Sequence, residues 1–205
     1  MVGSSVGVLL QAVQAGFAAF QGDLATWVPQ LFATWPAQDQ AEITNYFTQQ
    51  ATPLYFSLAY PMQPGLFPSC VVSMEPGAEE PGGDAFGMMQ AVSKQTDGTY
   101  QMWQGITQHD RFDIALRHPT NQKLLLWLDI IAWWALLYQR QSLIQQGFLQ
   151  QVLSRTGLEP DPWFEGQGSL PCFRRIVSLT VKHQVGYYTT APGVTAVQSS
   201  VSQAG

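Results

Sequence analysis

Charged side chains are scarce in this chain. Only 11% of the 205 residues are Asp, Glu, Lys or Arg, less than half of the share of about 25% that is usual in soluble domains. No Lys or Arg occurs in residues 1–93, which hold seven acids and therefore a net charge of −7. Residues 94–205 hold nine bases and seven acids, a net charge of +2. Because nucleic-acid-binding proteins normally present a basic face, a total of −5 argues against direct recognition of nucleic acid.

Cysteine is also scarce, since Cys70 and Cys172 are the only two and lie far apart. Neither belongs to a Cys-x-x-Cys pair or to a Cys/His spacing typical of zinc sites. They could form a disulfide or be two buried thiols, and we favour thiols because nothing else indicates secretion. The sequence also lacks a Gly-x-Ser-x-Gly elbow and a P-loop. We therefore expect no metal, no cofactor and no catalytic constellation.

Glutamine takes the place of the missing charges, with 25 Gln residues against 23 charged ones. An amide surface stays hydrated without strong charge repulsion, which favours a protein that packs against copies of itself. The uneven charge permits two interpretations. The acidic first part could be an ordinary solvated surface, or it could meet a basic patch on a neighbouring subunit.

The most apolar stretch is residues 121–140, NQKLLLWLDIIAWWALLYQR. Its uninterrupted apolar part, residues 124–138, falls short of the roughly 20 residues that a membrane span needs, and Asp129 lies in its middle. We predict a helix capped by Thr120 or Asn121 and ended by Gly147. A helix that is apolar on more than one face needs more than one cover, which could be a sheet with the N-terminal helices or another subunit.

Two periodicities define the other elements. Apolar residues at spacings of three and four predict a helix over residues 3–21, and AQDQAEITNYFTQQA predicts another after a Trp- and Pro-rich segment. FPSCVVSME, in which Val71 is flanked by Cys70 and Val72, is a short strand candidate. Period-two alternation predicts strands in residues 100–118, as one bent strand or two pieces with a bulge at Gly105, and around Val177. The order predicts an α+β fold, a small, mainly antiparallel sheet with a long helix packed across it. We expect an N-terminal helical segment over residues 1–60, an α+β core domain over 61–190 and a flexible tail over 191–205.

Candidate functional residues fall into an interface set and a weaker catalytic set. Aromatic residues and arginines are enriched at protein interfaces, and loop carboxylates can meet them. The interface set is Trp127, Trp133, Trp134, Arg174, Arg175, Glu79 and Glu80. Two other classes stay open: a small enzyme that uses His109, Asp110 and Asp113, and a carbohydrate-binding module that uses exposed Trp.

The order of elements resembles that of the tail-terminator, or tail-completion, proteins of long-tailed bacteriophages. The residues that carry the resemblance are FPSCVVSMEPGAEE, YQMWQGITQHDRFDIALRHPT, NQKLLLWLDIIAWWALLYQRQSLIQQGF and FRRIVSLTVKHQVGYY. In this family a strand that ends at a His-Pro corner leads into a long helix, and an Arg-led strand closes the sheet. The likeness covers roughly residues 1–190, and the chain departs from it in a longer N-terminal region (22–60) and a Pro/Gly insert (75–87).

The resemblance implies a structural role in the virion, after synthesis in the host cytoplasm. Such proteins form a homohexameric ring that caps the tail tube, and they contact the tube protein, the head-side neck proteins and, in contractile phages, the last sheath ring. A ring of this kind closes by a heterologous contact between two different faces of each subunit. Other neck, adaptor or baseplate components remain alternatives, and no membrane partner is implied.

Overall fold

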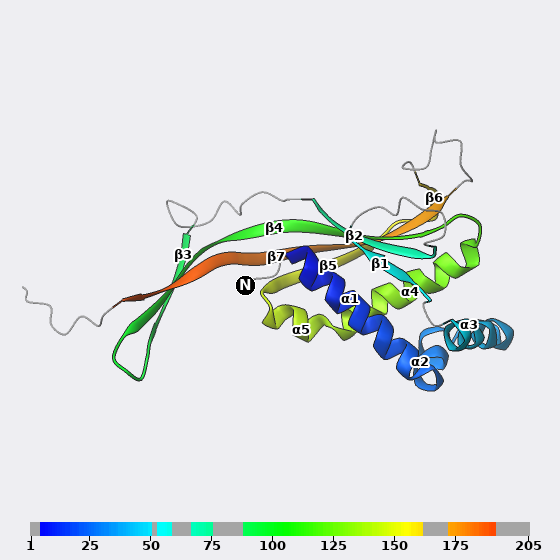
Figure 1. Ribbon diagram of the computed structural model, residues 1–205, viewed down its shortest axis with the longest axis horizontal. Helices are drawn as coiled ribbons and strands as arrows, with labels where there is room; N and C mark the ends of the chain where they lie inside the picture. The colour runs from blue at the N-terminus through cyan, green and yellow to red at the C-terminus, as the bar shows by residue number, and fades with distance from the viewer. Residues whose placement is uncertain (1–4, 51–52, 59–66, 76–87, 162–171, 192–205) are drawn as a thin grey trace, which may run out of the picture. The chain divides into compact units, whose positions relative to one another are not determined.

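The computed structural model describes residues 5–50, 53–58, 67–75, 88–161 and 172–191. It confirms an α+β fold, in which helices pack across a seven-stranded mixed sheet (Figure 1). The helices are α1 (Ser5–Gly22), α2 (Leu24–Leu31), α3 (Ala37–Gln49), α4 (Gln122–Tyr138) and α5 (Arg140–Gln145). The strands are β1 (Tyr55–Ser57), β2 (Ser69–Glu75), β3 (Met88–Lys94), β4 (Tyr100–His118), β5 (Phe148–Arg155), β6 (Glu159–Pro160) and β7 (Phe173–Ala191).

The sheet is mainly antiparallel, as the alternation predicts. Its order is β1-β2-β4-β7-β5, with β3 also paired to β4 and β6 also paired to β7. Four of the pairings are antiparallel (β2–β4, β3–β4, β5–β7 and β6–β7), whereas the three-residue β1 runs parallel to β2. The short β1 and the strand β5 are therefore the ends of this strand order.

The chain divides into two compact units. The first comprises residues 1–77 and 109–183, so α1–α3 share a unit with most of the sheet; the second comprises residues 78–108 and 184–205. In the second unit β3 and β4 form a hairpin whose turn includes Gly98, at a φ of 82° that favours glycine. There Gln95 N–H donates to the Thr99 carbonyl at 2.8 Å, which closes the turn.

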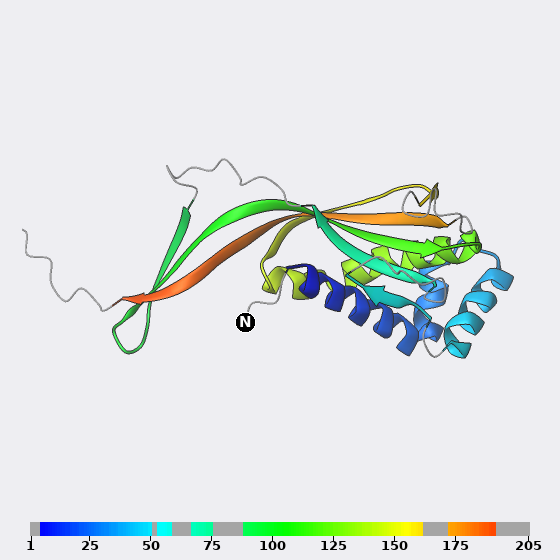
Figure 2. The same cartoon turned by 45° about the horizontal axis from the view of Figure 1, so that its top comes forward.

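In the first unit, α1 crosses α4 and packs against it on one face of the sheet (Figures 1 and 2). The sheet presents to them the alternating residues that the sequence predicts: Phe112, Ile114 and Leu116 of β4 and Val177, Leu179 and Val181 of β7, all buried. From α1 the buried stripe is Leu9, Val13, Phe17 and Phe20, while Val6 and Leu10 are partly buried against the same core. A single core thus joins the N-terminal helix, α4 and the sheet.

The closest approach of α1 to α4 occurs at Gly16. A Cβ added to Gly16 would lie 2.3 Å from the Cβ of Ala135 and 2.8 Å from its Cα. Real Cβ atoms essentially never come that near another atom, so only glycine permits this crossing. Interiors packed at crystal-like density leave no space for the missing methyl group.

The opposite face of the sheet is not uniformly solvated, although alternation of the kind seen in residues 112–117 of β4 is typical of a strand with one buried and one solvated face. Arg117 is fully buried there and forms an ion pair with Asp161, which follows β6 and is also buried. Ala115 is buried on the same face, and Ser178 is buried beside Asp113. Because Asp161 lies 44 positions along the chain from Arg117, only the tertiary fold explains a buried arginine in this alternating strand.

Other predictions need correction at the ends of elements. The long helix does not run to Gly147: α4 ends at Tyr138, and the short α5 follows after Gln139. Gly147, with a φ of 92°, instead follows α5. Residues 100–118 form one strand, and the predicted bulge is absent because Gly105 pairs with Met89 in a continuous register. The flexible tail beyond residue 191 lies outside the described residues.

Candidate interaction surface

The start of α4 is fixed by two side chains of the corner that precedes it. Asn121 Oδ1 accepts the Leu124 N–H at 2.9 Å, so Asn121 is the N-cap rather than Thr120. His118 Nδ1 accepts the N–H groups of Thr120 at 3.1 Å and Asn121 at 2.8 Å. Burial lowers the pKa of His118, which favours the neutral imidazole that can accept these bonds.

The sheet and α1 cover only part of α4. The buried positions are Leu124, Leu125, Trp127, Leu128, Asp129, Ile131, Ala132, Ala135 and Leu136. They include a stripe at helical spacing, made of Leu125, Leu128, Ala132, Ala135 and Leu136, which is one of the apolar faces of this helix. The remaining side of α4 is mostly apolar and is only partly covered within the described part of the chain.

That uncovered side is an apolar stripe with a lysine at its start. Lys123, Leu126, Ile130, Trp133 and Leu137 follow each other at spacings of three and four, which places them along one side of the helix. Leu126 is 37% exposed and Leu137 46% exposed, while Ile130 and Trp133 are partly buried. We call these five residues the outer stripe. Exposed apolar residues in a contiguous row indicate an interaction site more strongly than isolated ones.

Next to the outer stripe lies an aromatic cluster of Trp27, Trp134 and Tyr138. The Trp134 and Tyr138 rings stack with centroids 4.9 Å apart, and the Trp27 centroid lies 4.7 Å from Trp134 and 5.9 Å from Tyr138. Tyr138 is 52% exposed, although tyrosine and tryptophan dominate the energetics of interface cores. The cluster joins α2 to α4 and extends the apolar surface beyond the outer stripe.

A positively charged group lies beside the outer stripe at Trp133. The Arg155 guanidinium of β5 lies over the Trp133 ring, 4.9 Å from its centroid. Arg155 Nη1 also lies 3.6 Å from Asp129 Oδ2, and Arg175 Nη2 of β7 lies 3.3 Å from the same oxygen. Burial raises the pKa of Asp129, while the two arginines oppose that rise and favour the carboxylate. The buried carboxylate thus ties α4 to two strands.

A negatively charged group lies at the other end of the stripe. Lys123 Nζ is 2.6 Å from Asp39 Oδ1 and 2.6 Å from Glu42 Oε2, both on α3. The hydrogen bond from Lys123 lowers the pKa of Glu42, and the bonds to Asp39 and Glu42 raise the pKa of Lys123. The Lys123 ammonium also lies 5.5 Å from the centroid of the Trp127 ring.

The predicted interface residues lie in different environments. Trp127 is buried in the core, whereas Trp133 and Trp134 are partly buried at the uncovered side of α4. Arg174 pairs with Glu159 at 2.7 Å, and Arg175 pairs with Asp129, so both arginines have partners inside the chain. Glu79 and Glu80 lie outside the described residues.

Sequence reasoning missed Leu126, Leu137, Tyr138, Trp27 and Arg155 as surface candidates. The apolar composition of residues 124–138 indicates that several faces need cover, but it does not say which face the fold leaves open. Arg155 lies in β5, a strand that the sequence analysis does not predict. The signal available was the spacing of three and four from Lys123 to Leu137.

Two of the three residues of the catalytic alternative, Asp110 and Asp113, have described side chains. Asp113 Oδ1 accepts from Arg111 Nε at 3.0 Å and Ser178 Oγ at 2.6 Å, and Asp110 is buried. The side chain of His109 is outside the description. Among the described side chains there is no group of three or more His, Cys, Asp or Glu that could hold a metal ion. Cys70 and Cys172 are free and buried.

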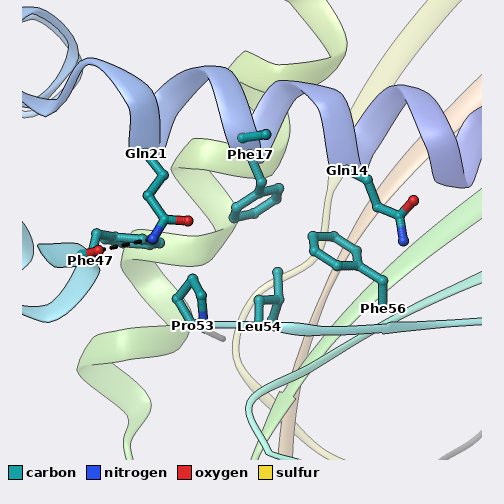
Figure 3. A pocket seen from close by; sticks show the side chains of 8 residues that line it. Gln14, Phe17, Gln21, Phe47, Pro53, Leu54 and Phe56 are labelled. Carbon is teal, nitrogen blue, oxygen red and sulfur yellow. Dashed lines mark hydrogen bonds between the residues drawn. The ribbon is translucent and has the colours of Figure 1, made fainter. Parts of the chain in front are cut away.

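A small pocket of about 120 Å³ lies between α1 and the segment that leads into β1 (Figure 3). Phe17, Phe47, Leu54 and Phe56 give it apolar walls, and Gln21 Nε2 donates to the Phe47 carbonyl at 3.0 Å. None of the residues that line it is ionisable. Such walls can accommodate a small apolar group but supply no acid, base or nucleophile.

The described helices include none with the length and hydropathy needed to cross a bilayer. No protein-family model matches the chain, and no curated protein matches it at a significant level. The interpretation of the surface therefore rests on its own chemistry: an apolar stripe, an aromatic cluster, a negative group at the start of the stripe and a positive group beside Trp133.

Proposed function

We propose that this protein is a structural component of a bacteriophage virion, a tail terminator that forms a ring on the end of the tail tube and joins it to the neck. The observation that carries the proposal is the uncovered side of α4. Leu126, Leu137 and Tyr138 are exposed although α4 is otherwise a core helix. Apolar side chains left in water on a core helix indicate a protein that works in an assembly, because a partner that covers them gains about 25 cal/mol for each Å² of apolar surface removed from water.

Two further features support a role in assembly. The order of elements, with helices before the sheet and a long helix before the last long strand, is the order on which the resemblance to tail terminators rests. Exposed apolar and aromatic side chains gather along one side of α4, which supports a role in assembly. An oligomer held by a heterologous contact needs two different faces on each subunit.

The test is electron microscopy of particles assembled without this protein. A terminator predicts tail tubes longer than those assembled with it, because nothing stops tube growth. Tails of normal length that lack heads would identify a neck or adaptor protein instead, and complete absence of tails would identify a baseplate component. Normal, infectious particles would overturn the structural proposal altogether.

Native mass spectrometry of the purified chain, alone and with tail tubes, tests the ring itself. The expected species has six copies, formed alone or on the tube end. A chain that stays monomeric both alone and with tubes would contradict the ring. As a control for specificity, tubes already capped by the protein should take up no more of it.

A further inference from the structure

Two charged groups of opposite sign lie along the outer stripe. At its start, one lysine faces two carboxylates (Lys123 with Asp39 and Glu42), so the group carries +1 − 2 = −1. Farther along, two arginines face one carboxylate (Arg155 and Arg175 with Asp129), so that group carries +2 − 1 = +1. Leu126 and Ile130 lie between them on the helix.

A surface with one negative and one positive group is complementary to a copy of itself. A two-fold axis that lies in the contact plane and bisects the line between the groups exchanges their positions. The negative group of each copy then faces the positive group of the other, and this makes two equivalent contacts. That arrangement is isologous, because the same patch serves both subunits.

We infer that the outer stripe of α4 binds a second copy of this chain about such a two-fold axis. The apolar residues between the charges, Leu126 and Ile130, lie nearest the axis and meet their own equivalents. Arg155, held on the Trp133 ring, faces Asp39 and Glu42 of the other copy. Lys123 contacts both of those carboxylates, but its single charge leaves the group with a net charge of −1 that attracts the incoming arginine.

Arg155 is suited to this role because its side chain is already ordered and still accessible. The Trp133 ring and the Asp129 carboxylate hold the guanidinium, yet the side chain is 44% exposed. A group held in its bound geometry loses less conformational entropy when a partner arrives. Arginine and tryptophan are also the residues most enriched where interfaces gain most of their free energy.

The size of the surface sets the strength that we expect. The 17 residues of α4 span roughly 25 Å, and a strip one helix wide over that length covers on the order of 250 Å². Stable interfaces bury about 800 Å² per partner, so α3 and the aromatic cluster must contribute as well. We therefore expect a dimer that forms reversibly and dissociates on dilution.

This inference goes beyond the proposed ring, because it names a second copy as the occupant of the outer stripe and leaves the ring contact to other faces of the subunit. A ring contact is heterologous and uses two different faces, whereas the stripe contact is isologous and uses one. Loss of the stripe contact should leave a ring intact. The absence of a ring would in turn leave the stripe contact untouched.

The symmetry is tested by cross-linking at Ile130, which lies in the middle of the outer stripe. The variant Ile130→Cys, treated with a short bis-maleimide, should give a covalent dimer. Burial raises the pKa of Cys70 to about 12 and that of Cys172 to about 11, so the native thiols stay protonated and unreactive. The matched control is Val152→Cys, because Val152 is an exposed apolar residue of β5 outside the stripe.

A dimer from Ile130→Cys but not from Val152→Cys would support the two-fold contact. Equal yields from both variants, or no dimer from either, would overturn it. The unmodified protein, treated in the same way, should stay uncross-linked. Circular dichroism spectra of both variants should match that of the unmodified protein, which shows that they are folded.

The strength of the contact is tested by sedimentation equilibrium of Leu126→Glu and the control Val152→Glu. A carboxylate in the apolar part of the contact should weaken dimerisation at least tenfold, whereas Val152→Glu should leave it unchanged. The combined exchange Arg155→Glu with Glu42→Arg should associate more tightly than Arg155→Glu alone. A strict monomer for the unmodified chain, or a Leu126→Glu variant that associates as well as Val152→Glu, would refute the contact.

Discussion

At the scale of the residue, protonation of the His118 imidazole affects the stability of the corner that precedes α4. Its Nδ1 accepts two backbone N–H groups, and burial lowers its pKa below the ordinary value of 6.5. The folded chain therefore binds a proton less readily than the unfolded chain. The stabilising contribution is complete above pH 6.5 and declines as the pH falls from there through the folded pKa.

We predict that the free energy of unfolding falls between neutral pH and about pH 5 more steeply than in His118→Asn. Asparagine retains an acceptor for the corner but does not titrate. Urea unfolding at a series of pH values measures the difference between the two proteins, which cancels the titration of other groups. Parallel curves for the two proteins would show that His118 contributes no pH dependence.

At Gly16, the absence of a Cβ atom permits the close packing of α1 against α4. We predict that Gly16→Ala lowers the free energy of unfolding by about 1–3 kcal/mol, as overpacked core substitutions do, because the new Cβ meets the backbone and Cβ of Ala135. The matched control is Gly22→Ala at the end of α1, where an added Cβ has no neighbour within 4 Å. Denaturant unfolding compares them. Equal midpoints would contradict the close helix crossing.

At the scale of the element, α4 is attached to the sheet by one buried carboxylate as well as by apolar contacts. We predict that Asp129→Ala lowers the free energy of unfolding by about 3 kcal/mol, since it leaves two arginines without their shared partner. Lys123→Met removes ion pairs at the exposed end of the same helix and should leave the unfolding midpoint almost unchanged. A larger effect at Lys123 than at Asp129 would reverse this ranking.

The elements with an uninterrupted pattern could be predicted from the sequence. The spacing of apolar residues located α1, and a short apolar run located β2. Alternation located residues 112–117 of β4 and the first part of β7. The strand β5 was not predicted, because its register with β7 shifts between Leu149 and Val152 and this breaks the alternation. The end of α4 at Tyr138 was not predicted either, since neither Gly nor Pro marks that position.

The candidate surface could be predicted only in part. Periodicity establishes that α4 is apolar on several sides, but it does not establish which sides α1 and the sheet will cover. The apolar residues at Leu126 and Leu137 become a site only because the fold leaves them exposed. The ion pair between Arg155 and Asp129 joins residues 26 positions apart, and no local pattern indicates such a pairing.

At the scale of the whole molecule, the reactivity of the two thiols shows whether the larger compact unit unfolds as one cooperative unit. Cys70 lies in β2 and Cys172 directly precedes β7, yet both belong to that unit and both are buried. We predict that neither thiol reacts with a disulfide reagent in the folded protein. Both should become reactive at the same denaturant concentration, because small compact units unfold cooperatively. Two separate midpoints would show that β2 and the start of β7 unfold independently.

The crowding of indole rings on α2 and α4 has an optical consequence. Trp27 and Trp134, with centroids 4.7 Å apart, are near enough for their electronic transitions to couple, and Tyr138 flanks both. Coupled chromophores give a circular dichroism signal that depends on their mutual orientation. Emission from partly exposed indoles also shifts to shorter wavelength when water is displaced. The molecule therefore carries its own spectroscopic probe, and arrival of a neighbour at this site should be visible without a dye.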